Sequence, residues 1–179
     1  MKTVTKELSK VNNGETFKIG DYEFIKFFDD NGKTTAVSKY CLFNSTFGAN
    51  NNFKESTVLK RLENEILPVL AETIGIENIC DIETDLTTLD GLKPYEKMTS
   101  KISLPTFDFY RNNVDIFDKY KINDWWWLAT PESANPHCSP NWIVCVSPHG
   151  YFFNISYYHD DGVRPFLCFV SSISVFCKE

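Results

Sequence analysis

The chain has 179 residues, a net charge of −6 and a sequence pI near 5.1. An acidic chain whose strongest basic cluster is Lys60-Arg61 lacks the electrostatic footprint of a nucleic-acid-binding protein. No apolar run approaches the roughly 20 residues that a membrane-spanning helix needs, and residues 1–20 lack the apolar region of a secretory signal peptide. We therefore expect one domain, with no nucleic-acid partner, no membrane insertion and no export by the general route.

The N-terminal third predicts a β-meander. Residues 1–14 are polar and end at the turn Asn12-Asn13-Gly14, so we expect a polar N-terminal segment followed by a single domain over 15–179. Asn31-Gly32 readily supplies the positive φ angles of a tight hairpin turn. The runs that read as strands are Glu15–Ile19, Tyr22–Phe28 and Thr34–Tyr40, and residues 41–52 read as a loop.

Two helices are predicted in the middle of the chain. From Glu55 the apolar period changes to about 3.6, and Pro68 either kinks this helix or begins a second short one that Gly75 ends. Residues 76–105 are expected to be irregular. The second helix begins at Thr106 as N-cap and ends before Lys121. The apolar stripes are Val58, Leu59, Leu62 and Ile66 on the first helix, and Phe107, Tyr110, Val114 and Phe117 on the second.

Short strands follow the second helix. The predicted strands are Trp125–Ala129, Trp142–Ser147, Tyr151–Ser156, Val163–Val170 and Ile173–Cys177, with turns at 148–150 and 160–162. Helices that lie between two blocks of strands indicate an α+β fold. The first and last strands are expected to pair and bring the termini together.

The composition of residues 133–160 points to a ligand-binding role. This stretch contains no Lys, Arg, Glu, Gln or Met, and it is rich in Tyr, Phe, Asn, Ser and His. Rigid amphipathic rings beside small polar groups are typical of a recognition surface, although a buried sheet core with polar turns is the alternative. The residues expected to bind a ligand are Asn135, His137, Asn141, Tyr151, Phe153, Asn154, Tyr157, Tyr158 and His159. A strand exposes alternate residues, so only some of them can face outward.

Catalytic and metal-binding patterns are weaker. The spacings between His137, His149 and His159 match no compact ligand motif, and we expect no metal and no cofactor. Asp160-Asp161 reads as the start of a turn, because adjacent acids in a strand point to opposite faces and cannot share a substrate. The six cysteines are scattered, with no CxxC pair, and are interpreted as free thiols; those at 145 and 168 are expected in the strand core.

Several phrases together resemble a large uncharacterised domain family of Firmicutes and their phages. They are Phe17-Lys18-Ile19-Gly20-Asp21-Tyr22-Glu23-Phe24, Ser38-Lys39-Tyr40-Cys41-Leu42, Glu55-Ser56-Thr57-Val58-Leu59-Lys60, Trp126-Trp127-Leu128-Ala129-Thr130-Pro131 and Gly162-Val163-Arg164-Pro165. The last two phrases also resemble the C-type lectin-like fold of formylglycine-generating-type domains and of the variable proteins of diversity-generating retroelements. That resemblance implies a C-type lectin-like domain in which Trp126, Trp127, Gly162, Arg164 and Pro165 are structural. Apart from the resemblance, Gly162-Val163-Arg164-Pro165 is interpreted as the close of a strand, with Arg164 bound to a carboxylate or to carbonyls.

The resemblance to retroelement variable proteins makes a compositional prediction. Replacement of adenines in Asn-type codons yields neither Lys, Glu, Gln nor Met, and residues 133–160 fit that alphabet except Trp142, which would then belong to the scaffold. The function that follows is a non-enzymatic receptor for a protein or glycan ligand on a cell surface.

The protein would belong to a phage virion or the bacterial cytoplasm, or be surface-displayed by another route. The alternatives are an enzyme of formylglycine-generating type and a structural oligomerisation module. The acidic partners that calcium-dependent sugar binding needs are missing beside Asn135-Pro136 and Asn141-Trp142.

Overall fold

The computed structural model describes residues 3–135 and 141–178, and it is an α+β fold dominated by β-sheets. The strands are β1 (Thr3–Glu7), β2 (Thr16–Ile19), β3 (Tyr22–Asp30), β4 (Lys33–Ser38), β5 (Phe43–Thr46), β6 (Ile82–Asp85), β7 (Lys97–Ser100), β8 (Trp126–Pro131), β9 (Trp142–Val146), β10 (Phe152–Ser156), β11 (Asp160–Val163), β12 (Phe166–Val170) and β13 (Ser174–Lys178). The helices are α1 (Thr57–Arg61), α2 (Leu67–Ile74), α3 (Phe107–Asn112) and α4 (Val114–Lys119), with short turns η1 (Leu8–Lys10), η2 (Phe53–Glu55), η3 (Leu62–Ile66) and η4 (Ile76–Asn78).

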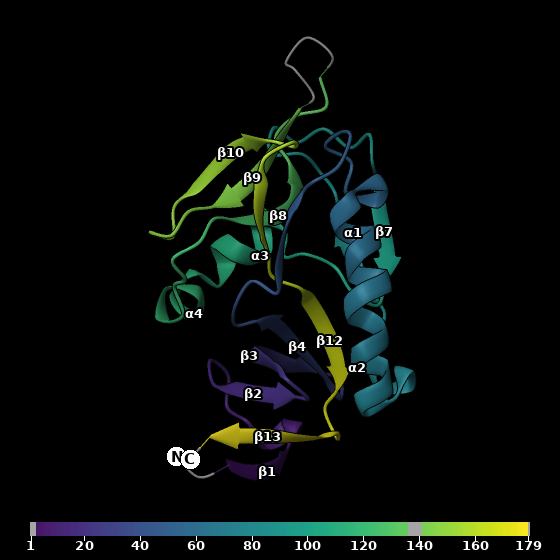
Figure 1. Ribbon diagram of the computed structural model, residues 1–179, viewed down its shortest axis with the longest axis vertical. Coiled ribbons are helices and arrows are strands. Elements are labelled where there is room, and N and C mark those ends of the chain that lie inside the picture. Colours follow the sequence, from purple (N-terminus) through teal and green to yellow (C-terminus); the bar gives the residue numbers. More distant parts are fainter. Residues whose placement is uncertain (1–2, 136–140, 179) are drawn as a thin grey trace.

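The strands form two large sheets and one hairpin. The six-stranded sheet has the order β1-β13-β2-β3-β4-β12, the five-stranded sheet the order β10-β9-β8-β11-β5, and β6 pairs only with β7. Figure 1 shows the six-stranded sheet at the end that carries both termini, the five-stranded sheet at the other end, and the long helix running beside both. The chain leaves the first sheet after β4 and returns to it between β11 and β12, at Arg164-Pro165.

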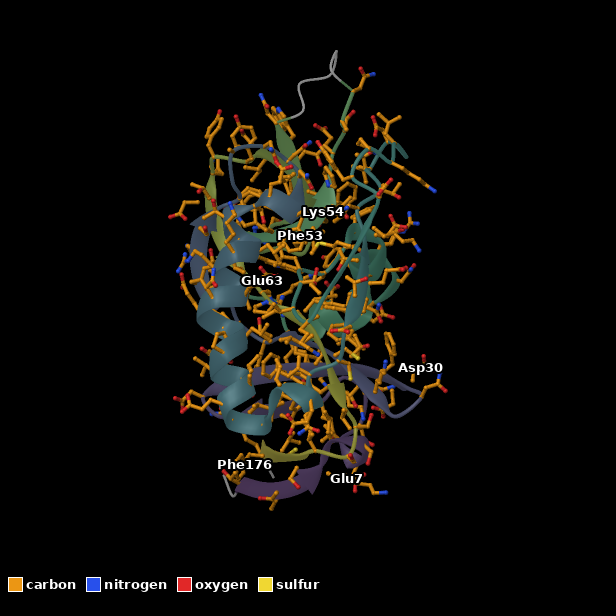
Figure 2. All side chains as sticks on the ribbon, turned by 90° about the vertical axis from the view of Figure 1, so that its right-hand side faces the viewer. Glu7, Asp30, Phe53, Lys54, Glu63 and Phe176 are labelled. Carbon is orange, nitrogen blue, oxygen red and sulfur yellow. The ribbon has the colours of Figure 1, made fainter. Side chains whose placement is uncertain are left out.

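The N-terminal meander is confirmed, and the sheet reaches further than expected. Asn31 and Gly32 both have positive φ, at 49° and 74°, and they close the hairpin between β3 and β4. Figure 2 shows Asp30 at the tip of this hairpin. The sequence placed residues 1–14 outside the domain, but Thr3–Glu7 pairs with β13, and Leu8 and Val11 are buried in the core. The predicted pairing of the strand at Glu15–Ile19 with the last strand is confirmed, because β2 pairs with β13 at Lys18 and Phe176, and β1 pairs with the other side of β13.

The first helix follows its predicted pattern. Ser56 caps it by accepting the Leu59 N–H at 2.9 Å, and its apolar stripe packs into the main core. The helix widens into the π-helical turn η3 immediately before Pro68, because proline cannot supply the N–H of a regular turn. Gly75 ends α2 with a φ of 84° and donates to the Ala71 carbonyl.

The second helix is interrupted. Thr106 is the N-cap, as predicted, but the helix stops at Asn113 and restarts as α4. The Asn113 side chain donates to the Phe109 carbonyl at 2.8 Å and so competes with the backbone for the helical acceptor. The break turns Val114 toward solvent, whereas Tyr110 and Phe117 are buried as expected.

Four local predictions were wrong. Residues 41–52 contain β5, a short polar edge strand, and residues 76–105 contain the β6–β7 hairpin, whose strands are joined by a long loop. Asp160-Asp161-Gly162 is not a turn but most of β11, which pairs with β5. The predicted strand Val163–Val170 is divided, because Arg164 and Pro165 carry the chain from one sheet to the other.

Candidate functional site

The exposed large rings at one end of the molecule cluster on the β9–β10 hairpin. We call these residues the aromatic surface: Trp142, Tyr151, Phe152, Phe153 and Tyr158. Tyr158 is 69% exposed and Tyr151 68%, which is far more than core aromatics show. The stretch 141–159 carries no Lys, Arg, Asp or Glu, so the hairpin itself adds no carboxylate, ammonium or guanidinium group, and Arg111 of α3 is a charged neighbour of Tyr151 and Phe152. Large rings exposed in this number on one hairpin are typical of a site of interaction.

The aromatic surface is held by rings on both sides of its strand. Phe152 packs on Phe107 of α3 with ring centroids 4.7 Å apart, and Phe153 packs on Trp125 on the other face at 5.3 Å. Alternate residues of a strand point to opposite faces, which explains this division. The surface is therefore anchored in position while half of each Phe ring stays in solvent.

Strand β10 is an edge of the five-stranded sheet. The Ser147 N–H donates to the Tyr151 carbonyl and the Tyr157 N–H to the Asn141 carbonyl. These bonds show that the odd-numbered residues of β10 direct their backbone groups toward β9. Backbone groups of residues 152, 154 and 156 consequently point away from β9. Asn154 Oδ1 and Ser156 Oγ lie on the same strand and have no hydrogen-bond partner within the described residues. Both oxygens are buried, so the groups that the edge offers beside the exposed rings are the outward-facing backbone N–H and C=O groups of β10.

The predicted ligand-binding residues divide into exposed and half-buried groups. Tyr151, Phe153, Tyr158 and His159 are exposed, whereas Asn135, Asn141, Asn154 and Tyr157 are half-buried. Asn154 Nδ2 donates to Glu132, and the Tyr157 ring packs against the main core, so both also support the hairpin. His137 lies outside the described residues.

Two members of the aromatic surface were not predicted as contacts. Phe152 was passed over, although it stands between two residues that were chosen, and its exposed fraction equals that of Phe153 within 1%. Trp142 was assigned to the scaffold from composition, yet its side chain is 43% exposed at the start of β9. It lies at the first position of β9, opposite Ser156 of the edge strand β10.

The residues expected to be structural are all buried. Arg164 is 1% exposed, and its Nε donates to the Ser38 carbonyl at 3.0 Å, as the carbonyl alternative predicted. Its guanidinium lies over the Trp126 ring at 4.7 Å and the Phe117 ring at 5.5 Å. Burial lowers the pKa of Arg164 to about 10, so it remains charged at neutral pH. This residue joins both sheets and α4 beneath the aromatic surface.

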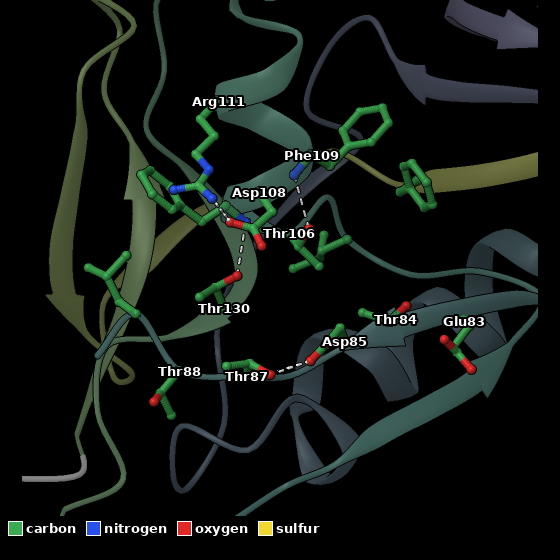
Figure 3. Close-up of a pocket in the computed structure, with 14 residues that line it drawn as sticks. Glu83, Thr84, Asp85, Thr87, Thr88, Thr106, Asp108, Phe109, Arg111 and Thr130 are labelled. Carbon is green, nitrogen blue, oxygen red and sulfur yellow. Dashed lines mark hydrogen bonds and ion pairs between the residues drawn. The ribbon is translucent and has the colours of Figure 1, made fainter. Parts of the chain in front are cut away.

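A groove of about 360 Å³ opens beside α3 and was not predicted from the sequence. Figure 3 shows Asp85 and Thr87 on one wall, and Thr106, Asp108 and Thr130 on the other. Thr130 accepts the Phe107 N–H at 2.8 Å and Thr106 accepts the Phe109 N–H, which leaves each hydroxyl hydrogen available as a donor. The groove therefore combines hydroxyls and carboxylates with the rings that lie beside them.

Two carboxylates of the groove, those of Asp85 and Asp108, are held by neighbouring side chains. Hydrogen bonds from the Thr87 side chain and N–H hold the pKa of Asp85 below its usual value. Asp108 pairs with Arg111 at 3.1 Å. Ionised carboxylates accept hydrogen bonds from neutral hydroxyls and repel anions, so the lining suits a small neutral polyol better than a phosphate.

The thiols of Cys41 and Cys145, in the five-stranded sheet and beside it, are unreactive at neutral pH. Burial raises the pKa values of Cys41 and Cys145 to about 12, so both thiols stay protonated at neutral pH. Burial also raises the pKa of Asp161, whose Oδ2 has no partner among the described residues, while Asp160 is exposed. The two acids thus point to opposite faces of β11, as adjacent residues of a strand do. Cys145 and Cys168 are buried, which confirms their predicted place in the strands.

The described residues hold no group of three or more His, Cys, Asp or Glu side chains that could bind a metal ion. Within the same residues, none of the helices has the length and apolar character required to cross a membrane. Comparison with protein-family models, with curated proteins and with solved structures finds no match for this chain.

Proposed function

We propose that this protein is a non-enzymatic, receptor-type domain that binds a protein ligand through the aromatic surface. The observation that carries the proposal is the set of half-exposed rings on the two faces of the β9–β10 hairpin, which are anchored by Phe107 and Trp125 but left open to solvent. Rigid aromatic rings contribute large contact areas at low entropic cost and dominate binding energies at protein interfaces. Polar contacts come from the exposed His159 and from the outward-facing backbone groups of β10.

The proposal includes a C-type lectin-like scaffold whose surface differs between copies of the protein, as in retroelement variable proteins. Support comes from the division of the C-terminal region into two sets of residues. The set formed by Trp126, Trp127, Gly162, Arg164 and Pro165 is buried, whereas the exposed rings lie in the stretch whose alphabet lacks Lys, Glu, Gln and Met. A scaffold that keeps its own core separate from its display positions tolerates change at those positions.

The two alternatives are less well supported. An enzyme of formylglycine-generating type requires reactive, accessible thiolates, and the raised pKa values of Cys41 and Cys145 oppose that chemistry at these two cysteines. An oligomerisation module would use the same rings to bind a second copy of the chain. Analytical ultracentrifugation at micromolar concentration distinguishes the oligomerisation module from the receptor, because a monomer would contradict an obligate interface between copies.

A display library tests the proposal without a known ligand. We expect full randomisation at Tyr151, Tyr158 and His159 to leave most clones resistant to protease, because exposed positions change unfolding free energy by about 0.5 kcal/mol or less. Randomisation at Trp127 and Arg164 serves as the matched control and should remove most clones.

The folded clones would then be selected on immobilised lysozyme as a model protein. Binders that carry changes at the three exposed positions, from a parent that does not bind, are the expected result. Equal loss of folded clones at exposed and buried positions, or no binder from a diverse folded library, would contradict a display surface.

A glycan is the second candidate ligand, and the groove beside α3 favours it. Its 360 Å³ falls in the range of small-ligand sites, and hydroxyl, carboxylate and aromatic groups line it together. Carboxylates and hydroxyls hydrogen-bond the ring hydroxyls of a neutral sugar, and the Phe107 and Phe109 rings offer apolar contact to its C–H face. No calcium ion is needed for this mode of binding.

Titration of the ¹⁵N-labelled protein with neutral hexoses tests the groove. We expect glucose, galactose, mannose or N-acetylglucosamine to shift amide signals of residues 83–89 and 106–111. Asp85→Ala should weaken this binding roughly tenfold or more, because it removes a charged acceptor. Asp115→Ala, an exposed acid outside the groove, is the control and should bind normally. Absence of shifts at high millimolar sugar would reject the glycan site.

A further inference from the structure

Two cysteines meet between segments that lie far apart in the chain. Ile79 forms an antiparallel bridge with Phe169 of β12, and the Cys80 N–H donates to the Cys168 carbonyl at 2.7 Å. Cys80 therefore lies directly opposite Cys168. Opposite residues of an antiparallel pair project from the same face with Cα atoms about 4.5–5.5 Å apart. A disulfide spans Cα separations of about 4.4–6.8 Å, so the backbone needs no rearrangement to accept one.

The two cysteines of this pair lie opposite each other and differ in exposure. Burial, and then the neighbouring Cys80, raise the pKa of Cys168 to about 11. Cys80 is half-exposed, whereas Cys168 is 7% exposed and lies beside Thr35 of β4. An oxidant in solution therefore reaches Cys80 first, and Cys168 lies opposite Cys80 on the paired strand.

We propose that Cys80 and Cys168 form a built-in oxidation site that closes to a disulfide. With a peroxide as oxidant, the Cys80 sulfur attacks the O–O bond to give a sulfenic acid and, from hydrogen peroxide, one water. The Cys168 sulfur then displaces hydroxide, which leaves as a second water after taking the thiol proton. In total two thiols lose two electrons and two protons, and one peroxide is reduced to two waters.

The disulfide would fasten β12 to the segment that leads into β6. Residues Glu83–Asp85 of that strand line the groove beside α3, so the bond would also fix one groove wall. The closed loop contains roughly 90 residues, which strongly restricts the unfolded chain. We expect the oxidised form to melt about 5–15 °C higher than the reduced form.

Hydrogen peroxide treatment of the reduced full-length protein tests the site. After unfolding and alkylation, the reduced protein should carry six labels, one on each cysteine, and the oxidised protein four. Peptide mapping should recover one linked pair that contains Cys80 and Cys168, and reduction should restore both the labels and the lower melting temperature. Linkage of other cysteines, or six labels after treatment, would overturn the proposal.

Variants separate this disulfide from general oxidation. Cys80→Ser should lose the linked peptide and the rise in melting temperature, while Cys177→Ser, at a buried cysteine of β13, should retain both. The peptide map of the wild-type protein tests the proposal even if a variant folds poorly. Higher oxidation of Cys80 with Cys168 left free would show that the pair does not close, and would also overturn the inference.

Discussion

Replacement of Trp127 by Ala is expected to lower the free energy of unfolding by about 4 kcal/mol, because large-to-small changes at a buried Trp leave a cavity that the core does not refill. Trp127 is fully buried in β8, its ring packs edge-on against Phe47 at 5.5 Å, and its Nε1 donates to the Ser45 carbonyl at 2.8 Å. The substitution therefore removes a core contact and leaves a buried carbonyl of β5 without its donor. Urea unfolding followed by circular dichroism measures the change.

Two companion variants locate the origin of that loss. Trp127→Phe keeps most of the ring contact but not the donor, and should lie between the wild type and Trp127→Ala. Trp142→Ala removes the same residue type from the exposed aromatic surface and should change the unfolding free energy by less than about 1 kcal/mol. Similar losses for Trp127→Ala and Trp142→Ala would show that the division between scaffold and surface is wrong.

Gly162→Ala is expected to destabilise the protein by about 3 kcal/mol, because the new methyl group has no space. A Cβ at this position would overlap the Cys41 sulfur and would lie 2.8 Å from the Trp125 carbonyl oxygen. Gly162 also donates its N–H to that carbonyl at 2.8 Å, which fixes β11 closely against β8. The glycine is therefore required by close approach of the backbone rather than by turn geometry.

The double variant Cys41→Ala with Gly162→Ala tests this explanation. Removal of the sulfur should recover part of the lost stability, while the clash with the Trp125 carbonyl remains. Gly91→Ala is the control, since Gly91 has a φ of 87° and no atom within 4 Å of an added Cβ. It should lose only about 1 kcal/mol of conformational energy. Complete independence of the two changes in the double variant would contradict the proposed contact between Cys41 and Gly162.

Local signals in the sequence predicted those elements whose geometry depends on neighbouring residues. Asn31-Gly32 has a turn preference strong enough to define its hairpin, and Ser56 and Thr106 are caps that act within one turn. Asp160-Asp161-Gly162 misled the prediction because its turn chemistry is equally local, whereas its partners in β5 and β8 lie more than 30 residues away. Tertiary pairing prevailed over turn propensity there.

The candidate sites show the same distinction. The aromatic surface comes from one continuous stretch, so its unusual composition was visible in the sequence. The groove is built from residues of β6, α3, β8 and β12, and no short pattern connects Asp85 with Thr106 and Thr130. The only local signal was Thr106, which was recognised as a cap and not as a lining residue. The sequence also did not predict which residues of the stretch are exposed. Tyr151 and Tyr157 are the same residue type, and only the folded hairpin leaves Tyr151 exposed and Tyr157 half-buried.

Sequencing codons 129–166 in many copies of this gene from a natural population of its source tests the proposed variable receptor most directly. The account predicts substitutions concentrated at adenine positions in the codons of exposed residues such as Tyr151, Tyr158 and His159. The buried neighbours Val144 and Cys145, within the same stretch, and the scaffold residues Trp127, Gly162 and Arg164 should stay unchanged. A region as uniform as the rest of the gene, or changes spread equally over buried and exposed codons, would contradict it.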